Sequence, residues 1–367
     1  MPSAKTTVRV VLSLVVSGIF VAISLRHTDP RAVLHAIAAA PRGPLFGYLL
    51  VLLGVHAVRT VRWGLLLAPV GRVGWKRLNS ASAIGFMLLA VLPFRLGELG
   101  RPLLVSRPSG AGQKLSRSGA LASCVVERII DGLAVGVLGI VALHVLATTG
   151  TTADRARTAA NLVTAGFGAL LLALVVAFLM RERAVALVRT LLTPVSPRIA
   201  ARVAHMLDSF VAGLHLGSAG RVVAVLLLTV VHWILHVWGF WLVAPAFGIP
   251  LTALMASTVL AANVVGVMIP AGPGGLGPSQ LATLAGVSIF YPAVAAIFSG
   301  GAASLGAEAV GAVAYANTIW LLQMVQAVTL GLVFLLTGHV SLAGLFEPPE
   351  AFESTAAPAA DRAQGST

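Results

Sequence analysis

The sequence predicts an all-α polytopic membrane protein. Of its 367 residues, 58% are hydrophobic and only 10% are charged, whereas soluble domains carry about 25% charged residues. The mean hydropathy is +0.95, and apolar stretches run nearly from end to end. We therefore expect one transmembrane domain over residues 1–346 and a disordered, acidic C-terminal tail over residues 347–367, where Pro, Ala and Ser are frequent.

The predicted spanning helices are the apolar stretches of about 20 residues, the length that crosses a bilayer. The first, Val8–Leu25, lacks a small-residue cleavage site before Arg26, so we expect a retained anchor rather than a cleaved signal peptide. The whole set predicts about seven or eight spans, the eighth being weaker because glycines and Glu308 interrupt it. The others are Leu45–Ala68, Gly119–Leu146, Ala159–Met180, Val222–Phe247, Thr252–Ile269 and Gly311–Leu336, with Pro292–Ala309 as the weaker one.

Two further apolar stretches, Ala81–Leu92 and Leu276–Phe290, are too short to cross the bilayer and are bordered by Pro or Gly. Such segments are typical of re-entrant or interfacial helices. A backbone that breaks within the membrane must be buried in protein or line a wet cavity. One such element in each half of the chain therefore favours a transporter-like arrangement.

The stretch 184–216 is apolar but also basic, and its apolar residues recur at helical spacing, with Arg198 and Arg202 largely on the other side. This pattern predicts a helix in the cytoplasmic membrane interface. Two roles stay open for it, a connector packed under the bundle and a helix that binds lipid headgroups.

Lysine and arginine are distributed unevenly among the predicted loops. With the N-terminus inside, the first three inner segments hold 2, 8 and 6 basic residues, and the outer loops hold 3, 2 and none. Because cytoplasmic loops carry the excess of Lys and Arg, we predict a plasma (inner) membrane protein with a cytoplasmic N-terminus. The net charge of +13 suits anionic lipid headgroups rather than nucleic acid, because the arginines are spread among apolar spans.

The strongest polar signal is V-V-E-R-I-I-D, from Val125 to Asp131, which places three charges near the start of an apolar span. Glu127 and Asp131 share a helix face, and Arg128 can also meet Asp131. At 1.5 Å per residue, Glu127 lies about 12 Å from a helix start near Gly119. Ionisable residues at such depth are functional candidates by default. The alternative is a structural ion-pair cluster that fixes helix packing.

A second polar signal, R-L-G-E-L-G-R, precedes the first and runs from Arg95 to Arg101. On a helix, Arg95, Glu98 and Arg101 would fall within an arc of about 120°, and Gly97 and Gly100 would allow another backbone or a headgroup to come close. Two guanidiniums around one carboxylate leave a net positive charge, which suits a phosphate. The alternative is a positive-inside turn with a surface salt bridge.

A third signal is the segment Pro270–Gln280, whose first nine positions hold four Gly and three Pro and cannot form a helix. Its free N–H groups stand just before a helix start, which is a natural anion site. It is not a Walker A loop, because no Gly-Lys-Ser/Thr follows. The candidate binding residues are Gly274, Gly275, Gly277 and Gln280, and the alternative is a tight re-entrant turn needed only for shape.

Metal and cofactor chemistry is not expected. Cys124 is the only cysteine, so no multi-cysteine metal site can form. His232 and His236 stand four apart, as metal-binding pairs do, but no carboxylate joins them locally, and an interfacial Trp/His belt is the better interpretation. Polar residues of the last span are expected to make interhelical hydrogen bonds: Asn317, Gln323 and Gln326.

The three motifs, in this order, resemble the flippase-like membrane domain of the lysylphosphatidylglycerol synthases, the multiple peptide resistance factors. The same family includes many stand-alone membrane proteins. The resemblance rests on R-L-G-E-L-G-R, V-V-E-R-I-I-D and the P-G-G-L-G of residues 273–277, and it covers roughly Val8 to Leu336. It implies a polytopic domain with re-entrant helices that moves polar lipids between leaflets. The chain lacks a soluble aminoacyltransferase domain, so we do not expect it to make lysyl lipids.

Two departures from the family pattern bear on the substrate. After Gly277 the family commonly has a charged pair ending in Glu, where this chain has Pro278, Ser279 and Gln280. The family often carries an Arg near the position of Asn317. Both losses could remove one matched charge pair together, which leaves the family's usual substrate and coupling open for this chain.

The leading functional interpretation is a translocase of polar or charged lipids, or of a lipid-linked substrate, between membrane leaflets. Arg95, Arg101 and Arg128 would hold the headgroup, with Glu127 and Asp131 neutralising or orienting them. The sequence shows no nucleotide-binding motif, so transport would be downhill or coupled to an ion.

Two alternatives come from other functional classes. One is a non-catalytic membrane partner of an envelope or lipid-modifying enzyme. The other is a membrane-embedded transferase with Glu127 or Glu98 as general base. No catalytic residue is assigned. The expected partners are membrane lipids with anionic or modified headgroups, and a partner envelope enzyme and a homo-oligomer stay open.

Overall fold

The computed structural model describes residues 15, 17–23, 28–92, 97–106, 115–146, 151–194, 196–197, 199–201, 203–204, 208, 218–269, 271–299 and 306–337. Every regular element in these ranges is a helix, which confirms the predicted all-α class. Of the first predicted span, Val8–Leu25, residues 17–23 are described, and they are helical. The predicted tail and Arg95 lie outside the described residues.

Five long helices form the body of the protein: α3 (Arg42–Leu67), α6 (Arg117–Val145), α7 (Thr151–Leu179), α10 (Ala219–Val243) and α14 (Ala307–Leu336). Within the described ranges, four stretches are long and apolar enough to cross a membrane: Arg42–Leu67, Asp154–Ala173, Ala219–Phe247 and Ala307–Leu336. The helix α6 has 29 residues but carries the charges of V-V-E-R-I-I-D. The 3-10 turn η2 (Ala244–Phe247) extends α10.

One predicted span is instead part of a helical hairpin in the C-terminal half of the chain. The helix α11 (Ala253–Met268) has 16 residues, and at 1.5 Å per residue it is about 24 Å long, short of the ~30 Å hydrocarbon core. The chain turns back through η3 (Pro273–Gly275) into α12 (Pro278–Ser288). The predicted span Thr252–Ile269 is therefore one arm of a broken hairpin, and its turn holds the Gly/Pro-rich motif.

The weaker predicted span, Pro292–Ala309, is wrong as a continuous helix. The helix α13 (Pro292–Ser299) lies in the first part of this stretch, but Gly306 is extended, with φ −67° and ψ 178°, and α14 begins at Ala307. Residues 300–305 lie outside the described residues.

The N-terminal hairpin pairs α4 (Trp75–Val91) with α5 (Gly100–Val105). The helix α4 begins before the predicted Ala81, because the polar first turn from Trp75 is also helical. The two arms run antiparallel and touch through glycines. A Cβ at Gly85 would meet Arg101, and a Cβ at Gly97 would meet the backbone of Leu88. This close backbone contact needs residues without side chains.

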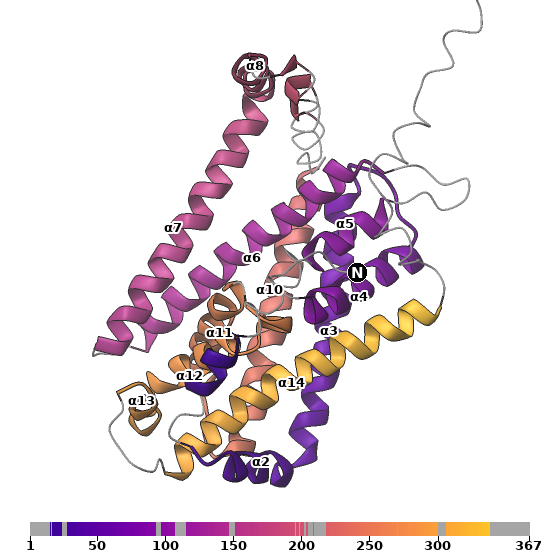
Figure 1. The fold of residues 1–367 in the computed structure, drawn as a ribbon. Coiled ribbons are helices and arrows are strands. Elements are labelled where there is room, and N and C mark those ends of the chain that lie inside the picture. Colours follow the sequence, from indigo (N-terminus) through magenta and orange to yellow (C-terminus); the bar gives the residue numbers. More distant parts are fainter. Residues whose placement is uncertain are drawn as a thin grey trace, which may run out of the picture.

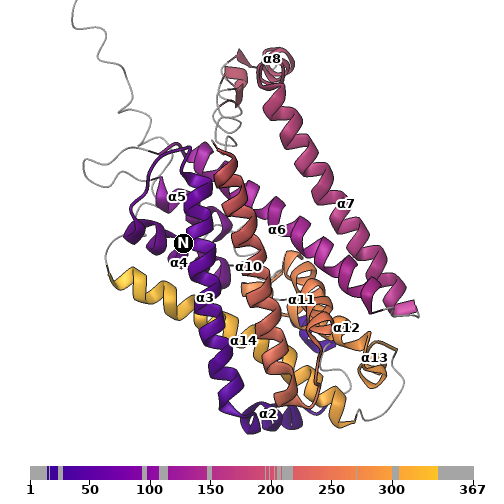
Figure 2. The same ribbon diagram turned by 180° about the vertical axis from the view of Figure 1, so that it is seen from behind.

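The helices form a bundle with one arm that leans away from it (Figures 1 and 2). The helices α3 and α10 lie side by side, and α14 crosses them obliquely. The short helix α2 (Pro30–Ala39) lies across one end of the bundle. The helices α6 and α7 meet near one end, where Gly132 and Gly136 face Phe167 and Thr164, and then diverge toward α8.

The segment 184–216 is not one continuous helix. The helix α8 (Arg181–Leu192) ends just before Pro194, because proline cannot continue the helical hydrogen-bond ladder. Arg181 Nε donates to Asp208 Oδ1 at 2.7 Å, which connects α8 to the segment that follows.

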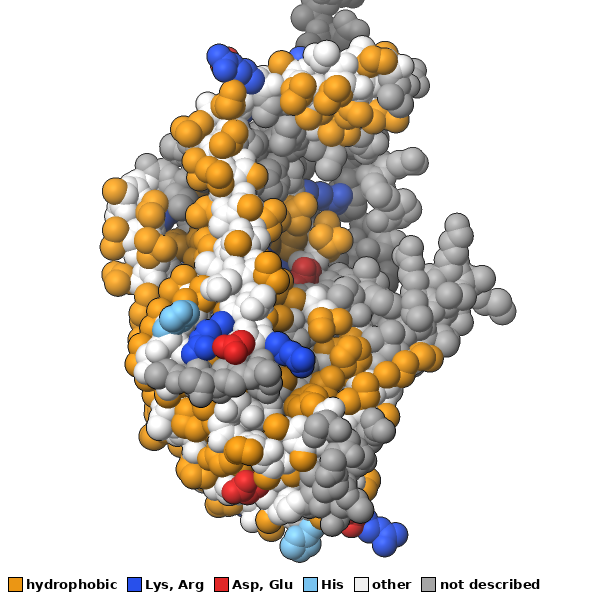
Figure 3. Space-filling view, turned by 90° about the vertical axis from the view of Figure 1, so that its left-hand side faces the viewer, with side chains coloured by type: hydrophobic (Ala, Val, Ile, Leu, Met, Phe, Trp, Pro, Cys, Tyr) orange, Lys and Arg blue, Asp and Glu red, His pale blue; other side chains and the backbone are white. Residues whose placement is uncertain are grey.

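The outer surface is apolar along the bundle. Figure 3 shows hydrophobic side chains along the length of α7, with charged side chains gathered at its two ends. Leucines and valines of α7 and α10 are exposed, among them Leu162, Leu172, Leu227 and Val230. Exposed apolar faces of this extent are expected against lipid tails. With its apolar helices, the structure is that of an integral membrane protein.

Candidate functional site

A buried ion pair joins α3 to α6 at the centre of the site. Arg62 NH1 and NH2 donate to the two oxygens of Asp131 at 2.7 and 2.9 Å, a bidentate arrangement. Arg62 NH1 also donates to Thr229 Oγ1 of α10 at 3.1 Å. The Arg62 side chain is 1% exposed. A guanidinium so deep in an apolar protein requires partners of this kind, because an unpaired buried charge is strongly destabilising.

Glu127 accepts hydrogen bonds from arginines of α3 and α5. Its Oε2 accepts from Arg101 NH1 of α5 at 2.7 Å, and its Oε1 accepts from Arg62 NH2 at 3.1 Å and from Arg59 Nε at 3.4 Å. The Glu127 side chain is fully buried. At 1.5 Å per residue, Glu127 lies about 15 Å from the start of α6, and Arg59 about 12 Å from the end of α3. The cluster is therefore well inside the membrane-spanning region.

Two aromatic rings fix the planes of these guanidiniums. The Cζ atom of Arg101 lies 4.2 Å from the ring centroid of Trp63 and 4.6 Å from that of Phe86. The Cζ atom of Arg59 lies 3.9 Å from the Phe86 centroid. Trp63 Nε1 donates to Ser123 Oγ of α6 at 3.1 Å, which holds that ring in place. Stacking on aromatic faces stabilises the arginines where water is excluded.

A second pair lies at the edge of this cluster. Arg128 Nε and Glu98 Oε1 are 4.0 Å apart, and their side chains are 34% and 36% exposed. Because the pair is partly open to solvent, it stabilises the fold much less than the buried pairs do.

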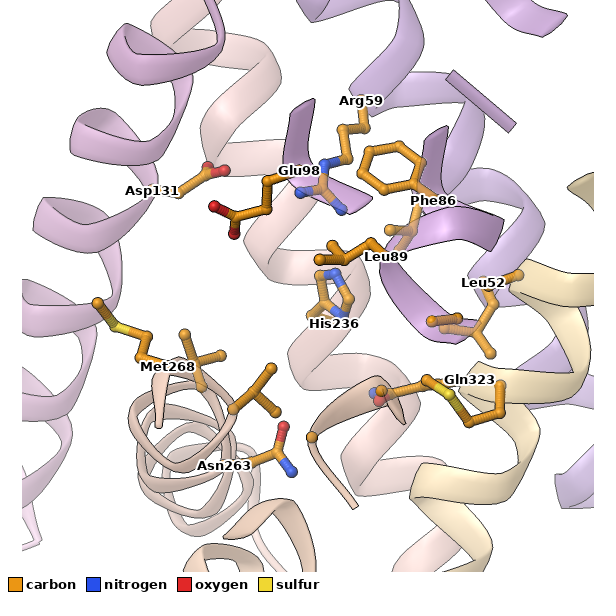
Figure 4. A pocket seen from close by; sticks show the side chains of 18 of the residues that line it. Leu52, Arg59, Phe86, Leu89, Glu98, Asp131, His236, Asn263, Met268 and Gln323 are labelled. Carbon is orange, nitrogen blue, oxygen red and sulfur yellow. The ribbon is translucent and has the colours of Figure 1, made fainter. Parts of the chain in front are cut away.

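A cavity of about 510 Å³ opens beside the cluster. Figure 4 shows the carboxylates of Glu98 and Asp131 and the guanidinium of Arg59 pointing into it, with His236 below them. The polar residues that line it are His56, Arg59, Glu98, Arg128, Asp131, His232, His236, Asn263, Gln323 and Gln326. Leu52, Leu89, Val264 and Met268 are among the apolar residues that complete the lining. The lining is mostly apolar with charged and amide side chains grouped within it, and a cavity of this kind and size can hold a lipid headgroup with part of its chain, or ordered water.

The opposite wall of the cavity is neutral and comes from α11, η3 and α14. Asn263 Nδ2 donates to Ser279 Oγ at 2.8 Å and to Thr283 Oγ1 at 2.9 Å, which ties α11 to α12. Gln323 Nε2 donates to the hydroxyl of Tyr48 at 2.9 Å. The carbonyl of Gly274 accepts from Trp320 Nε1 at 3.0 Å. A neutral hydrogen bond, from Trp320 to Gly274, thus anchors the turn of the C-terminal hairpin to α14.

The predicted site residues fall into three groups. Glu98, Arg128, Asp131, Gly274 and Gly275 line the cavity. Glu127 and Arg101 belong to the buried cluster beside it and do not appear in its lining. Gln280 Oε1 accepts from the backbone N–H of Gly277 at 2.7 Å, so these two residues cap α12 within the hairpin. Arg95 lies outside the described residues.

Arg59 and Arg62 were not among the site residues predicted from the sequence. Both lie inside the predicted span Leu45–Ala68, three residues apart. An arginine within a span is a functional candidate on its own, so the signal was available. His56, three residues earlier, also lines the cavity, and its Nε2 lies 2.8 Å from Asn79 Oδ1.

The two histidines of α10 line the cavity without forming a metal site. The ring centroids of His232 and His236 are 4.7 Å apart. Among the described residues, no group of three or more His, Cys, Asp and Glu side chains is placed to hold a metal ion. Within the same part of the chain, Nδ1 of each ring is buried without a hydrogen-bond partner.

Comparison with known families agrees with the resemblance drawn from the three motifs. Residues 10–306 match the family described as the lysylphosphatidylglycerol synthase transmembrane region. Because the match covers well over half of the chain, the protein belongs to this family. Family membership places it among membrane proteins involved in lipid handling. No curated protein and no solved structure matches the chain.

Proposed function

We propose that this member of the lysylphosphatidylglycerol synthase transmembrane-region family moves polar lipids, or lipid-linked molecules, between the two leaflets. The observation that carries the proposal is a cavity with charged side chains on one wall, enclosed by helices with apolar outer faces. A charged headgroup meets a high barrier in the hydrocarbon core, and a cavity lined by charges and amides lowers that barrier by replacing the headgroup's water.

The two broken hairpins support a path rather than a closed pocket. The turn η3 packs against α4, and a Cβ at Gly274 would lie 3.4 Å from the carbonyl oxygen of Ala90. The break of the C-terminal hairpin therefore meets the end of α4 at the cavity, and such breaks are tolerated at membrane depth only where they are buried or line a wet space. Movement of one hairpin against the other would open the cavity toward either leaflet, as in transporters with discontinuous helices.

The residues divide between binding and support in this proposal. Arg59 and Arg128 line the cavity and would contact the headgroup. Glu127, Arg62 and Arg101 hold α3, α5 and α6 together behind them. By the positive-inside rule, the end of the bundle that carries α8 and the first turns of α6 and α10 would face the cytoplasm.

Lipid movement in proteoliposomes tests the proposal. The purified protein is reconstituted with phospholipids that carry a fluorescent label on one short acyl chain, and dithionite bleaches the label in the outer leaflet. We expect wild-type vesicles to lose the protected inner-leaflet signal, and Arg59→Gln to slow the loss about tenfold by removing a charge-assisted contact. Arg31→Gln, on exposed α2, is the matched control and should behave as wild type.

Two results would overturn the proposal. Wild-type vesicles that keep the inner-leaflet signal as fully as protein-free vesicles would favour a non-catalytic partner of an envelope enzyme. Equal rates for Arg59→Gln and wild type, with unchanged thermal unfolding, would show that lipid does not pass the cavity.

A further inference from the structure

We infer that the cavity selects lipids whose headgroup is a phosphate anion bearing hydroxyl groups, and that it excludes headgroups carrying an amine. The inference rests on the proposed function and concerns which lipids this same site accepts.

The formal charge of the site favours an anion. Among the described residues, four arginines and three carboxylates form the cluster and its edge, which leaves a charge of +1: Arg59, Arg62, Arg101 and Arg128 against Glu98, Glu127 and Asp131. The three cavity histidines are counted as neutral, because an imidazolium there would add a like charge beside the guanidiniums. A site with one excess positive charge is completed electrostatically by one anion.

An amine headgroup would need one of the carboxylates as its partner, and each carboxylate already lies beside an arginine. Both oxygens of Asp131 accept from Arg62. Both oxygens of Glu127 accept from arginines, and its side chain is fully buried. Glu98 faces Arg128. An ammonium entering the cavity would have to displace an arginine hydrogen bond at Asp131 or Glu127, and would meet Glu98 beside the guanidinium of Arg128, while repelled by the excess positive charge.

Arg59 provides a guanidinium that is oriented toward the cavity. Only its Nε contacts Glu127, at 3.4 Å. Among the described residues its NH1 and NH2 have no hydrogen-bond partner, and its side chain is 17% exposed. Stacking on Phe86 fixes the plane of the group, and Figure 4 shows it beside Glu98, above His236. Two parallel N–H donors in a fixed plane match a phosphate better than any neutral group.

The neutral wall of the cavity, opposite Arg59, provides hydrogen-bond acceptors. Asn263 uses its Nδ2 on Ser279 and Thr283, and Gln323 uses its Nε2 on Tyr48. The Nδ2 of Asn263 is thus occupied, Gln323 has used one of its two N–H donors, and the amide oxygen of each residue is an acceptor in the cavity lining. Acceptors suit the hydroxyls of a glycerol or sugar headgroup. Gln326 lines the same wall and adds an uncharged amide.

Three lipids that share acyl chains and label test the inference in the proteoliposome assay: phosphatidylglycerol, phosphatidylcholine and lysyl-phosphatidylglycerol. We expect phosphatidylglycerol to move about tenfold faster than lysyl-phosphatidylglycerol, with phosphatidylcholine between them. Gln326→Glu brings the site charge to zero and should reduce the preference to less than about twofold. Gln326→Leu keeps the charge at +1 and should keep the preference for the anion over the amine.

The outcomes separate the two proposals. Equal or faster movement of the lysyl lipid by wild type would overturn the selectivity while leaving translocation in place. Failure of all three lipids to move would overturn the function itself. Uptake of radiolabelled glycerol 3-phosphate without lipid movement would assign the site to a soluble phosphate and overturn the lipid inference.

Discussion

The two broken hairpins around the cavity are held by opposite kinds of interaction. The α4–α5 hairpin is tied to the bundle through Arg101, which reaches Glu127 of α6 at 2.7 Å and stacks on Trp63 of α3. The α11–α12 hairpin is closed by amides and hydroxyls of its own two arms, Asn263 with Ser279 and Thr283. The α4–α5 hairpin depends on partners in α3 and α6, whereas the α11–α12 hairpin is closed mainly by neutral hydrogen bonds between its own two arms.

The difference shows where charge can be buried in such a protein. Glu127 is tolerated because arginines from α3 and α5 converge on it and satisfy both of its oxygens. On the α11–α12 side only neutral groups line the described part of the cavity, and the family's charged positions are Gln280 and Asn317 in this chain. Asn317 Nδ2 donates to Val313 of its own helix, and Gln280 caps Gly277. Asn317 Nδ2 and Gln280 Oε1 therefore have local partners, whereas Gln280 Nε2 is buried without one among the described residues.

The largest effect is expected from Glu127→Gln, which breaks the charged side. Three guanidiniums would lose their shared carboxylate, and removing one partner from a buried ion pair costs about 3–5 kcal/mol. We expect a clear drop in the thermal unfolding temperature in detergent, followed by circular dichroism, and reduced recovery of monodisperse protein.

Glu308→Gln is the matched control for this variant. Glu308 is exposed in the first turn of α14, so the same loss of charge should leave the unfolding temperature near that of wild type. If both variants unfold like wild type, the ion cluster does not hold the N-terminal hairpin.

Two glycine substitutions compare the hairpins directly and are expected to come next. A Cβ at Gly97 would meet the backbone of Leu88 and Leu89, and a Cβ at Gly266 would meet Ala282 and lie 2.6 Å from the carbonyl oxygen of Pro278. Overpacking of this kind costs about 1–3 kcal/mol, so both alanine variants should unfold at lower temperature than wild type. Gly43→Ala, where no atom lies within 4 Å of the new Cβ, is the control. A loss in one hairpin alone would show that only that hairpin needs the close contact.

The sequence predicted the helices and the backbone breaks better than it predicted which side chains contact one another. Apolar length predicts α3, α7, α10 and α14, and Gly and Pro mark both turns, because these features are local. The bounds of α11 agree with the predicted Thr252–Ile269 to within one residue at each end, but its place as one arm of a broken hairpin was not predicted. Arg101 was expected to face a headgroup, but the structure buries it between Trp63 and Phe86. Which helices pack together decides such roles, and periodicity along one chain does not report it.

A smaller effect is expected from Asn263→Ala on the neutral side. The change removes hydrogen bonds to Ser279 and Thr283, but Thr283 still donates to the carbonyl of Ser279. A neutral hydrogen bond contributes about 1 kcal/mol net, so the unfolding temperature should fall by a few degrees at most. Ser257→Ala, on the same helix, removes a hydroxyl that bonds only within α11 and serves as the comparison. A loss as large as that of Glu127→Gln would contradict the distinction between the hairpins.

The smallest effect on stability is expected from Arg128→Gln, and this variant separates stability from selectivity. The Arg128–Glu98 pair is 4.0 Å apart and about one-third exposed, so its loss should cost less than about 1 kcal/mol. The same change lowers the site charge from +1 to zero, as Gln326→Glu does from the opposite wall. If charge rather than one contact sets selectivity, both variants should lose the preference for phosphatidylglycerol while unfolding like wild type. A preference that survives in Arg128→Gln but not in Arg59→Gln would instead assign selectivity to the oriented guanidinium of Arg59, because that group alone would then distinguish the phosphate.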